Sequence, residues 1–221
     1  MDPSLAPTAI VDSDHPAVAA FARRAAGEGT DRERAVRLYY AVRDGFRYDP
    51  YAFGTSAKWL RASRTLEAGA GWCVPKAVLL AACCRAEGIP ARLGFADVRN
   101  HLATERLVRL MGTDTFLWHG YVSLRLDGRW VKATPAFNVE MCRRFDVLPL
   151  EFDGTADSLL QPFDARSRRH MEYVRDRGLF DDVPLDAMAA ELRAAYPRLV
   201  EMVERREQGG AFEREAVRRV E

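Results

Sequence analysis

The sequence lacks several features that would assign it to a familiar class of protein. No apolar run approaches the ~20 residues that a membrane-spanning helix needs, and the first residues lack the basic and then apolar pattern of a secretory signal. Neither sign of charge dominates, because 33 basic and 32 acidic residues leave a formal net charge of +1. Neither a basic surface for nucleic acid nor an acidic tail is therefore indicated. We expect a cytoplasmic protein without a nucleic-acid or membrane partner.

Cysteine is also scarce, and its spacing excludes two further classes. Four cysteines, at positions 73, 83, 84 and 142, are too few for a disulfide framework in a chain of this length. No paired Cys-x-x-Cys spacing indicates a structural zinc site, and we expect no metal and no other cofactor. The remainder is ordinary globular composition, with 48% hydrophobic and 29% charged residues, which is ample for one core.

The first third of the chain predicts helices followed by a loop. Pro16 suits the first position of a helix, and Thr30 with Glu33 has the spacing of a capping box that begins a second helix. Residues 49–64 mix aromatic residues with Gly, Ser and Pro, which predicts an irregular loop.

The most informative segment is Gly71-Trp72-Cys73-Val74-Pro75-Lys76-Ala77, which is followed by an apolar run and then by Gly88-Ile89-Pro90-Ala91-Arg92. This pattern predicts a buried helix with Cys73 at its N-terminus, closed by a glycine and a proline. The dipole and the unpaired N–H groups of a helix N-terminus favour negative charge, so they lower the pKa of a thiol there. Cys83 and Cys84 lie in the middle of the same helix and are expected in the core.

The centre of the chain predicts strands. Residues 91–98 resemble one strand, and residues 116–126 alternate between apolar and polar side chains. Asp127-Gly128 is a strong signal for a two-residue hairpin turn, so residues 129–134 are expected to return as the partner strand.

The hairpin turn implies a register for the two strands. Leu126 then faces Arg129, and counting outward pairs Tyr121 with Thr134. Because His119 and Tyr121 point to the same face of the strand, Thr134 becomes a diagonal neighbour of His119, within side-chain reach.

Residues beyond the hairpin carry weaker signals. Residues 139–182 have no regular pattern, so they are either coil over the hairpin or a lid that influences substrate choice. Residues 184–206 have helical periodicity, with Pro197 dividing or kinking the helix.

Taken together, the motifs in residues 71–92 and 119–134 resemble the transglutaminase-like superfamily, over roughly residues 30–138. The resemblance implies an α+β fold of papain-like type, with a catalytic helix packed on an antiparallel sheet. We expect a core over residues 15–150 and a C-terminal extension over residues 151–221 that is mainly helical and packed on the core.

The same resemblance implies acyl transfer through a thioester, with Cys73 as nucleophile and His119 as base. The substrate would be a peptide, a protein or a small amide. Water or an amine would take the acyl group, so a protease, an amidase and an acyltransferase all remain open. Taken alone, a cysteine in an apolar helix and a histidine on a strand are more often structural residues.

The third catalytic position departs from the family pattern. The family has an aspartate where this chain has Thr134. A threonine hydroxyl accepts a hydrogen bond from imidazole but brings no charge, which cysteine catalysis tolerates better than serine catalysis. Asn138 is the alternative, whereas Asp97 or Glu140 would require the chain to fold back.

Other roles in the site remain open at this stage. An oxyanion hole would use the Cys73 backbone N–H with a second donor, and Trp72, Trp59 or Tyr51 would provide that donor or line a substrate groove. Because the family aspartate is missing, the alternative function is a catalytically impaired fold that serves as a peptide-binding or scaffold module. The oligomeric state does not follow from the sequence.

Overall fold

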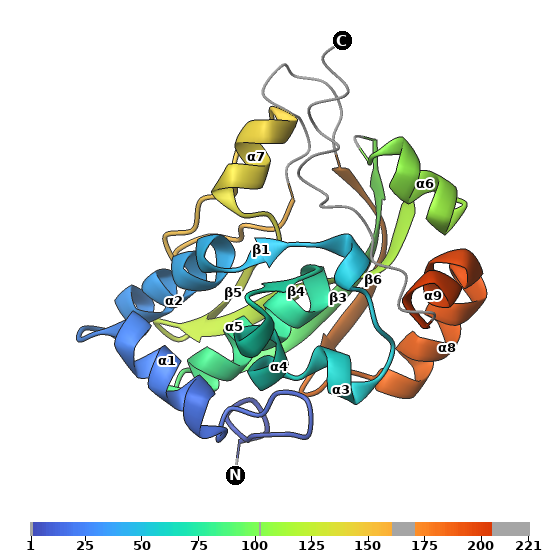
Figure 1. Ribbon diagram of the computed structural model, residues 1–221. Helices are drawn as coiled ribbons and strands as arrows, with labels where there is room; N and C mark the ends of the chain where they lie inside the picture. Colours follow the sequence, from blue (N-terminus) through green and yellow to red (C-terminus); the bar gives the residue numbers. More distant parts are fainter. Residues whose placement is uncertain (1, 102, 161–170, 205–221) are drawn as a thin grey trace.

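The computed structural model describes residues 2–101, 103–160 and 171–204 (Figure 1). The fold mixes helices with antiparallel strands, as expected. The elements in chain order are α1 (Pro16–Ala26), α2 (Asp31–Gly45), β1 (Arg47–Tyr48), η1 (Pro50–Ala52), α3 (Ala57–Leu60), α4 (Ala62–Ala68), β2 (Ala70–Gly71), α5 (Cys73–Ala86), β3 (Ala91–Asn100), α6 (Glu105–Met111), β4 (Thr115–Leu126), β5 (Arg129–Ala133), α7 (Val139–Phe145), β6 (Met171–Phe180), α8 (Leu185–Ala195) and α9 (Pro197–Glu204).

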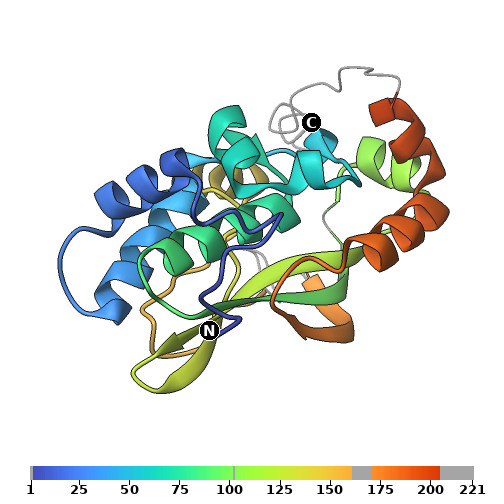
Figure 2. The ribbon, with the colours of Figure 1, turned by 90° about the horizontal axis from the view of Figure 1, so that it is seen from below.

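A four-stranded antiparallel sheet in the order β5-β4-β3-β6 forms one layer of the molecule. The helices of the first half of the chain gather on one face of this sheet (Figure 2). Helix α5 lies at the centre of this layer, and each of its residues from Cys73 to Arg85 is buried. A helix that is apolar on all sides has to be enclosed, so the apolar run after Cys73 explains its central place.

The local start signals of the first two helices are confirmed. Helix α1 begins at Pro16, and α2 has the complete capping box, in which Thr30 and Glu33 each accept a hydrogen bond from the backbone N–H of the other. Cys83 and Cys84 are buried in α5, as the sequence predicts.

Two segments are more ordered than the sequence suggests. Residues 49–64 contain η1, α3 and the start of α4, so the prediction of an irregular loop is wrong there. Residues 139–182 contain α7 and the long strand β6, so they are not simply coil. Most side chains of β6 are at least partly exposed, and the strand therefore lacks the alternation that would have identified it.

The register of the hairpin agrees with the prediction from the turn as far as Val122 and Ala133. The ladder ends at that pair, and the Thr134 N–H donates to the carbonyl oxygen of Ser158 at 2.9 Å. Tyr121 and Thr134 consequently lie one step beyond the paired residues. The observed pairs are Leu126–Arg129, Arg125–Trp130, Leu124–Val131, Ser123–Lys132 and Val122–Ala133.

The segment after residue 151 contributes to the sheet as well as adding helices. Strand β6 pairs with β3 over residues 93–100, and α8 and α9 follow it at the side of the sheet (Figure 1). None of the helices in the described ranges is long and apolar enough to cross a membrane.

Gly94 is required because the ring of Tyr121 lies over it. The two residues are direct partners in the β3–β4 ladder, and a Cβ at Gly94 would lie 2.1 Å from Tyr121 Cε2. We expect Gly94→Ala to displace the buried ring and to lower the free energy of unfolding by about 1–3 kcal/mol, measured by urea denaturation. Gly45→Ala in α2 is the matched control, since a Cβ there meets nothing within 4 Å. Equal midpoints for the two variants would contradict the role of Gly94.

Candidate functional site

Cys73 is the first residue of α5, with Trp72 as the N-cap, and its exposed fraction is only 4%. The strand that carries His119 lies directly against this first turn. A Cβ at Gly120 would lie 3.0 Å from the Val74 Cα and 3.3 Å from the Cys73 carbonyl oxygen. A side chain at this position would therefore be crowded. The glycine brings the residue after His119 into contact with the nucleophile candidate.

Burial dominates the electrostatics of the thiol. It raises the pKa of Cys73 to about 12, although the backbone N–H groups of Gly120, Val74 and Cys73 itself act in the opposite direction by stabilising the thiolate. The neutral thiol is therefore the resting form near pH 7. A reaction at this sulfur needs a base that removes the proton as the sulfur attacks.

A small cavity of about 30 Å³ adjoins Cys73. Trp72 lines it, is 6% exposed, and its Nε1–H is buried without a hydrogen-bond partner in the part of the chain that the structure describes. Tyr48 also lines it, and burial, followed by the nearby Cys73 charge, raises the pKa of Tyr48 well above its ordinary value. A residue that lines the Cys73 cavity therefore carries an unused hydrogen-bond donor.

His119 and Thr134 are both buried and line a second, smaller cavity of about 10 Å³. The Thr134 N–H is bonded to Ser158, and its carbonyl oxygen accepts from the Tyr39 hydroxyl at 3.2 Å. Its Oγ1 is buried and has no partner among the residues described. A buried hydroxyl without a hydrogen bond costs about 1–3 kcal/mol, so this atom is held at the cavity against a stability penalty.

The other sequence candidates lie elsewhere. The Oδ1 of Asn138 accepts from the Tyr48 N–H at 2.9 Å, and Asn138 does not line the cavity of His119. Trp59 is 43% exposed on the surface. Tyr51 packs its ring against Arg106, 4.5 Å from the guanidinium carbon. Neither aromatic residue lines the Cys73 cavity.

Trp118, directly before His119, has a strained backbone with φ of 59°, at a break in the β3–β4 register. Its N–H donates to Asp97 Oδ1 at 3.1 Å, and its indole N–H donates to Glu191 Oε2 at 3.2 Å. Arg177 joins both acids, because it donates to the two Asp97 oxygens at 2.6 and 2.9 Å and lies 2.7 Å from Glu191 Oε2. This network fixes the backbone that leads into His119.

Asp97 lies close to this region. Strand β3 runs antiparallel to β4, with Ala96 opposite His119, so the chain folds back between the two strands and brings Asp97 beside the strand of His119. Its carboxylate is nevertheless bound to Arg177 and to the Trp118 N–H.

Lys76 anchors the start of α5 to the end of α2. Its buried Nζ donates to the carbonyl oxygens of Arg43 at 2.8 Å and Phe46 at 2.7 Å. Burial lowers the pKa of this ammonium group to about 7. The helix that presents Cys73 is thereby fixed three residues after the cysteine.

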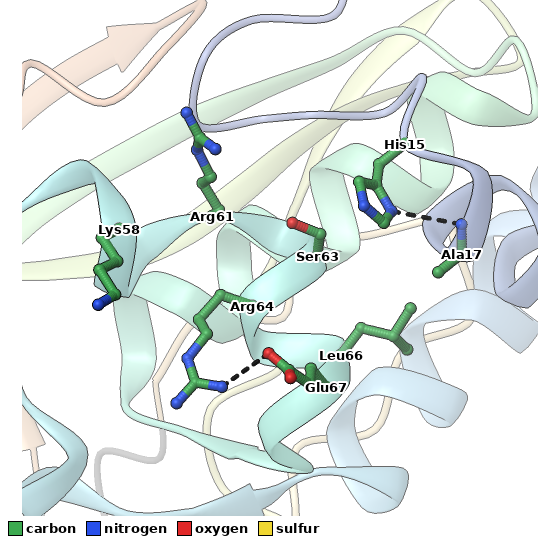
Figure 3. Close-up of a pocket in the computed structure, with 8 residues that line it drawn as sticks. All are labelled: His15, Ala17, Lys58, Arg61, Ser63, Arg64, Leu66 and Glu67. Carbon is green, nitrogen blue, oxygen red and sulfur yellow. Dashed lines mark hydrogen bonds and ion pairs between the residues drawn. The ribbon is translucent and has the colours of Figure 1, made fainter.

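A wider surface pocket of about 670 Å³ lies at α1, α3 and α4 (Figure 3). Lys58, Arg61 and Arg64 line it, and Arg64 is paired with Glu67 at 2.7 Å. None of the candidate residues lines this pocket, so the chemistry is sought at Cys73 instead. Within the described ranges, no group of three or more His, Cys, Asp or Glu side chains is placed to hold a metal ion.

A cysteine at the N-terminus of a buried helix, with an antiparallel sheet packed against it and a histidine on the adjoining strand, defines an α+β protein of papain-like type. A family model for the transglutaminase-like superfamily matches residues 19–135, more than half of the 221 residues. The chain belongs to the transglutaminase-like superfamily.

Two solved structures have a similar fold. One, from Cytophaga hutchinsonii, is named as a candidate cysteine protease, with 18% identity, a TM-score of 0.46, and 80% of this chain aligned to 53% of that one. The other, from Parabacteroides distasonis, is named as a candidate protease, with 15% identity, a TM-score of 0.39, and coverage of 57% and 26%. The chain spans about half the length of the first of these. No curated protein has significant sequence similarity to it.

Sequence reasoning missed residues of two kinds. Gly120 had a signal, since a glycine inside a strand often marks close approach of another backbone. Arg177 and Tyr196 had none, because their contacts depend on the packing of β6 and α8 against distant strands.

The Asp97–Arg177 pair has side chains that are 7% and 6% exposed. We expect Arg177→Met to lower the free energy of unfolding by about 3–5 kcal/mol, because it leaves a buried carboxylate without its cation. Adding Asp97→Asn should recover part of this loss. The free energy of unfolding of each variant is measured by urea denaturation. Arg175→Met is the control and should change this free energy little, because Arg175 is exposed on the same strand. Full additivity of the two substitutions would show that the pair is not coupled.

Proposed function

We propose that the protein is a thiol-dependent enzyme that cleaves an amide or peptide bond through a thioester at Cys73. One observation carries this proposal: Gly120, the residue after His119, packs against the first turn of α5, where its backbone N–H acts to lower the pKa of Cys73. The strand of the candidate base and the helix of the candidate nucleophile therefore meet at the sulfur atom.

In the proposed reaction, His119 removes the thiol proton while the sulfur forms a bond to the substrate carbonyl carbon. The carbonyl π electrons move to oxygen, where the Cys73 backbone N–H and the Trp72 Nε1–H donate hydrogen bonds to the oxyanion. The intermediate then re-forms the carbonyl and breaks the C–N bond. The imidazolium returns its proton to the leaving amine, and water or a second amine later releases the acyl group from sulfur.

Thr134 is proposed as the residue that orients His119. Thr134 lines the cavity that His119 also lines, and its Oγ1 is buried with no hydrogen-bond partner within the described residues, so this oxygen is available to the imidazole. Asn138 is less favoured for this role, since its Oδ1 is already bonded to the Tyr48 N–H.

A second function is favoured by two of the same observations. Thr134 brings no charge, and burial raises the pKa of Cys73 to about 12, so the fold would also suit a peptide-binding module without turnover. The two functions differ in whether the Cys73 thiol reacts faster than the other buried thiols of the chain.

Cys73 should react with iodoacetamide at pH 7.5 at least about tenfold faster than Cys83 or Cys84, because it has backbone N–H donors and an adjacent base. Its pKa is raised, so the rate should keep rising beyond pH 9, where a thiol of ordinary pKa near 8.5 is mostly ionised. The sites are quantified by peptide mass spectrometry, and His119→Ala should slow the labelling at pH 7.5. Equal rates at Cys73 and Cys83 would favour the binding module.

Thr134→Val should raise the free energy of unfolding by about 1 kcal/mol, because it removes an unpartnered buried hydroxyl, and it should slow labelling of Cys73. Ser123→Ala is the matched control, since Ser123 Oγ is also buried without a partner in the described part of the chain. That variant should gain stability without a change in labelling. Thr134→Asp should accelerate labelling if the hydroxyl occupies the orienting position. If all three variants label at the rate of the unmodified protein, Thr134 has no role in the site.

A further inference from the structure

The Cys73 cavity has an apolar wall. Of its described lining residues, none is charged. The wall includes Phe53, Leu107 and Phe116 from the first part of the chain, and Leu192 and Leu199 from α8 and α9.

The hydroxyl of Tyr196, another lining residue, already donates one hydrogen bond and accepts another. It donates to the carbonyl oxygen of Thr115 at 2.8 Å and accepts from the Leu117 N–H at 2.6 Å. Tyr196 therefore presents its ring to the cavity and holds the beginning of β4 in place.

Trp72 differs from these residues because it lines the same site and its Nε1–H is buried without a partner among the residues described. A site with an apolar wall and one free donor suits a ligand that combines an apolar group with a carbonyl oxygen. A charged group would lose its hydration there without gaining a counter-ion.

We infer that this cavity is the subsite for a small, uncharged aliphatic side chain on the acyl part of the substrate, of the size found in alanine or valine. At about 30 Å³, the cavity exceeds the ~10–15 Å³ that one water molecule needs in the same kind of measure, so it admits a small aliphatic group but not an aromatic ring. The inference rests on the proposed function, since it places the scissile carbonyl at Cys73.

The C-terminal helices contribute to this choice of substrate. Leu192, Tyr196 and Leu199 all lie outside residues 19–135, which the family model matches. A segment outside the match to the family model thus closes the wall of the subsite and limits its size.

Acetylated amino aldehydes test the inference on the intact protein. The Cys73 sulfur bonds to the aldehyde carbon, the carbonyl π electrons move to oxygen, and the thiol proton ends on that oxygen. We expect acetyl-alaninal and acetyl-valinal to protect Cys73 from iodoacetamide at concentrations at least about tenfold lower than those needed for acetyl-phenylalaninal. The difference from acetyl-aspartal should be larger still. Equal protection by the aspartate and valine aldehydes would overturn the subsite.

Leu199→Ala should enlarge the cavity and bring protection by acetyl-phenylalaninal to within about threefold of that by acetyl-valinal. Val200→Ala is the matched control, because Val200 is on the same helix and is buried but does not line the cavity. If Leu199→Ala does not fold, Leu199→Val provides a smaller change in the same direction. An unchanged order of aldehydes in the folded Leu199 variant would overturn the role of α9.

The subsite and the proposed enzyme can fail separately. Selective labelling of Cys73 with no preference among the aldehydes would support the proposed enzyme and contradict the subsite. An unreactive Cys73 would contradict the proposed enzyme. The subsite is then tested by measuring, through tryptophan fluorescence, how tightly acetyl-valinamide and acetyl-aspartamide bind to the Cys73→Ala variant. Tighter binding of the valine amide supports the subsite, and equal binding overturns it.

Discussion

The contact between Gly120 and the first turn of α5 is the constraint on which the rest of the site depends. Because a Cβ at this position would lie 3.0 Å from the Val74 Cα, a glycine allows the helix to approach the sheet this closely without crowding. The approach places a strand N–H at the Cys73 sulfur and makes His119 the neighbouring residue on β4. The residues of α5 from Cys73 to Arg85 are all buried, and most of them are apolar. Its two buried cations, Lys76 and Arg85, donate to backbone carbonyl oxygens.

Enclosure has electrostatic consequences for the whole site. Burial raises the pKa of Cys73 to about 12 and leaves Trp72 Nε1 and Thr134 Oγ1 without hydrogen-bond partners among the described residues. Unsatisfied buried groups are few in folded proteins and call for an explanation. Here two of them belong to residues that line the cavities of Cys73 and His119.

The parts of the molecule that the sequence predicts are those governed by local signals. The caps of α1 and α2, the apolar run of α5 and the Asp127-Gly128 turn each act over a few residues. Strand β6 escaped prediction because it pairs on one edge with β3 and has mostly exposed side chains. The Asp97–Arg177 pair joins residues 80 positions apart, so it depends on that unpredicted strand.

A neutral threonine near His119 is consistent with a neutral thiol at Cys73. A carboxylate in a triad is useful because it stabilises the imidazolium of a charged state, but a buried carboxylate carries its own desolvation penalty. With the pKa of Cys73 raised to about 12, the resting site holds a thiol and needs no counter-ion for a preformed thiolate. In the proposed mechanism, positive charge on His119 would have to be stabilised only during proton transfer, by the negative charge that develops on the sulfur and then on the substrate oxygen.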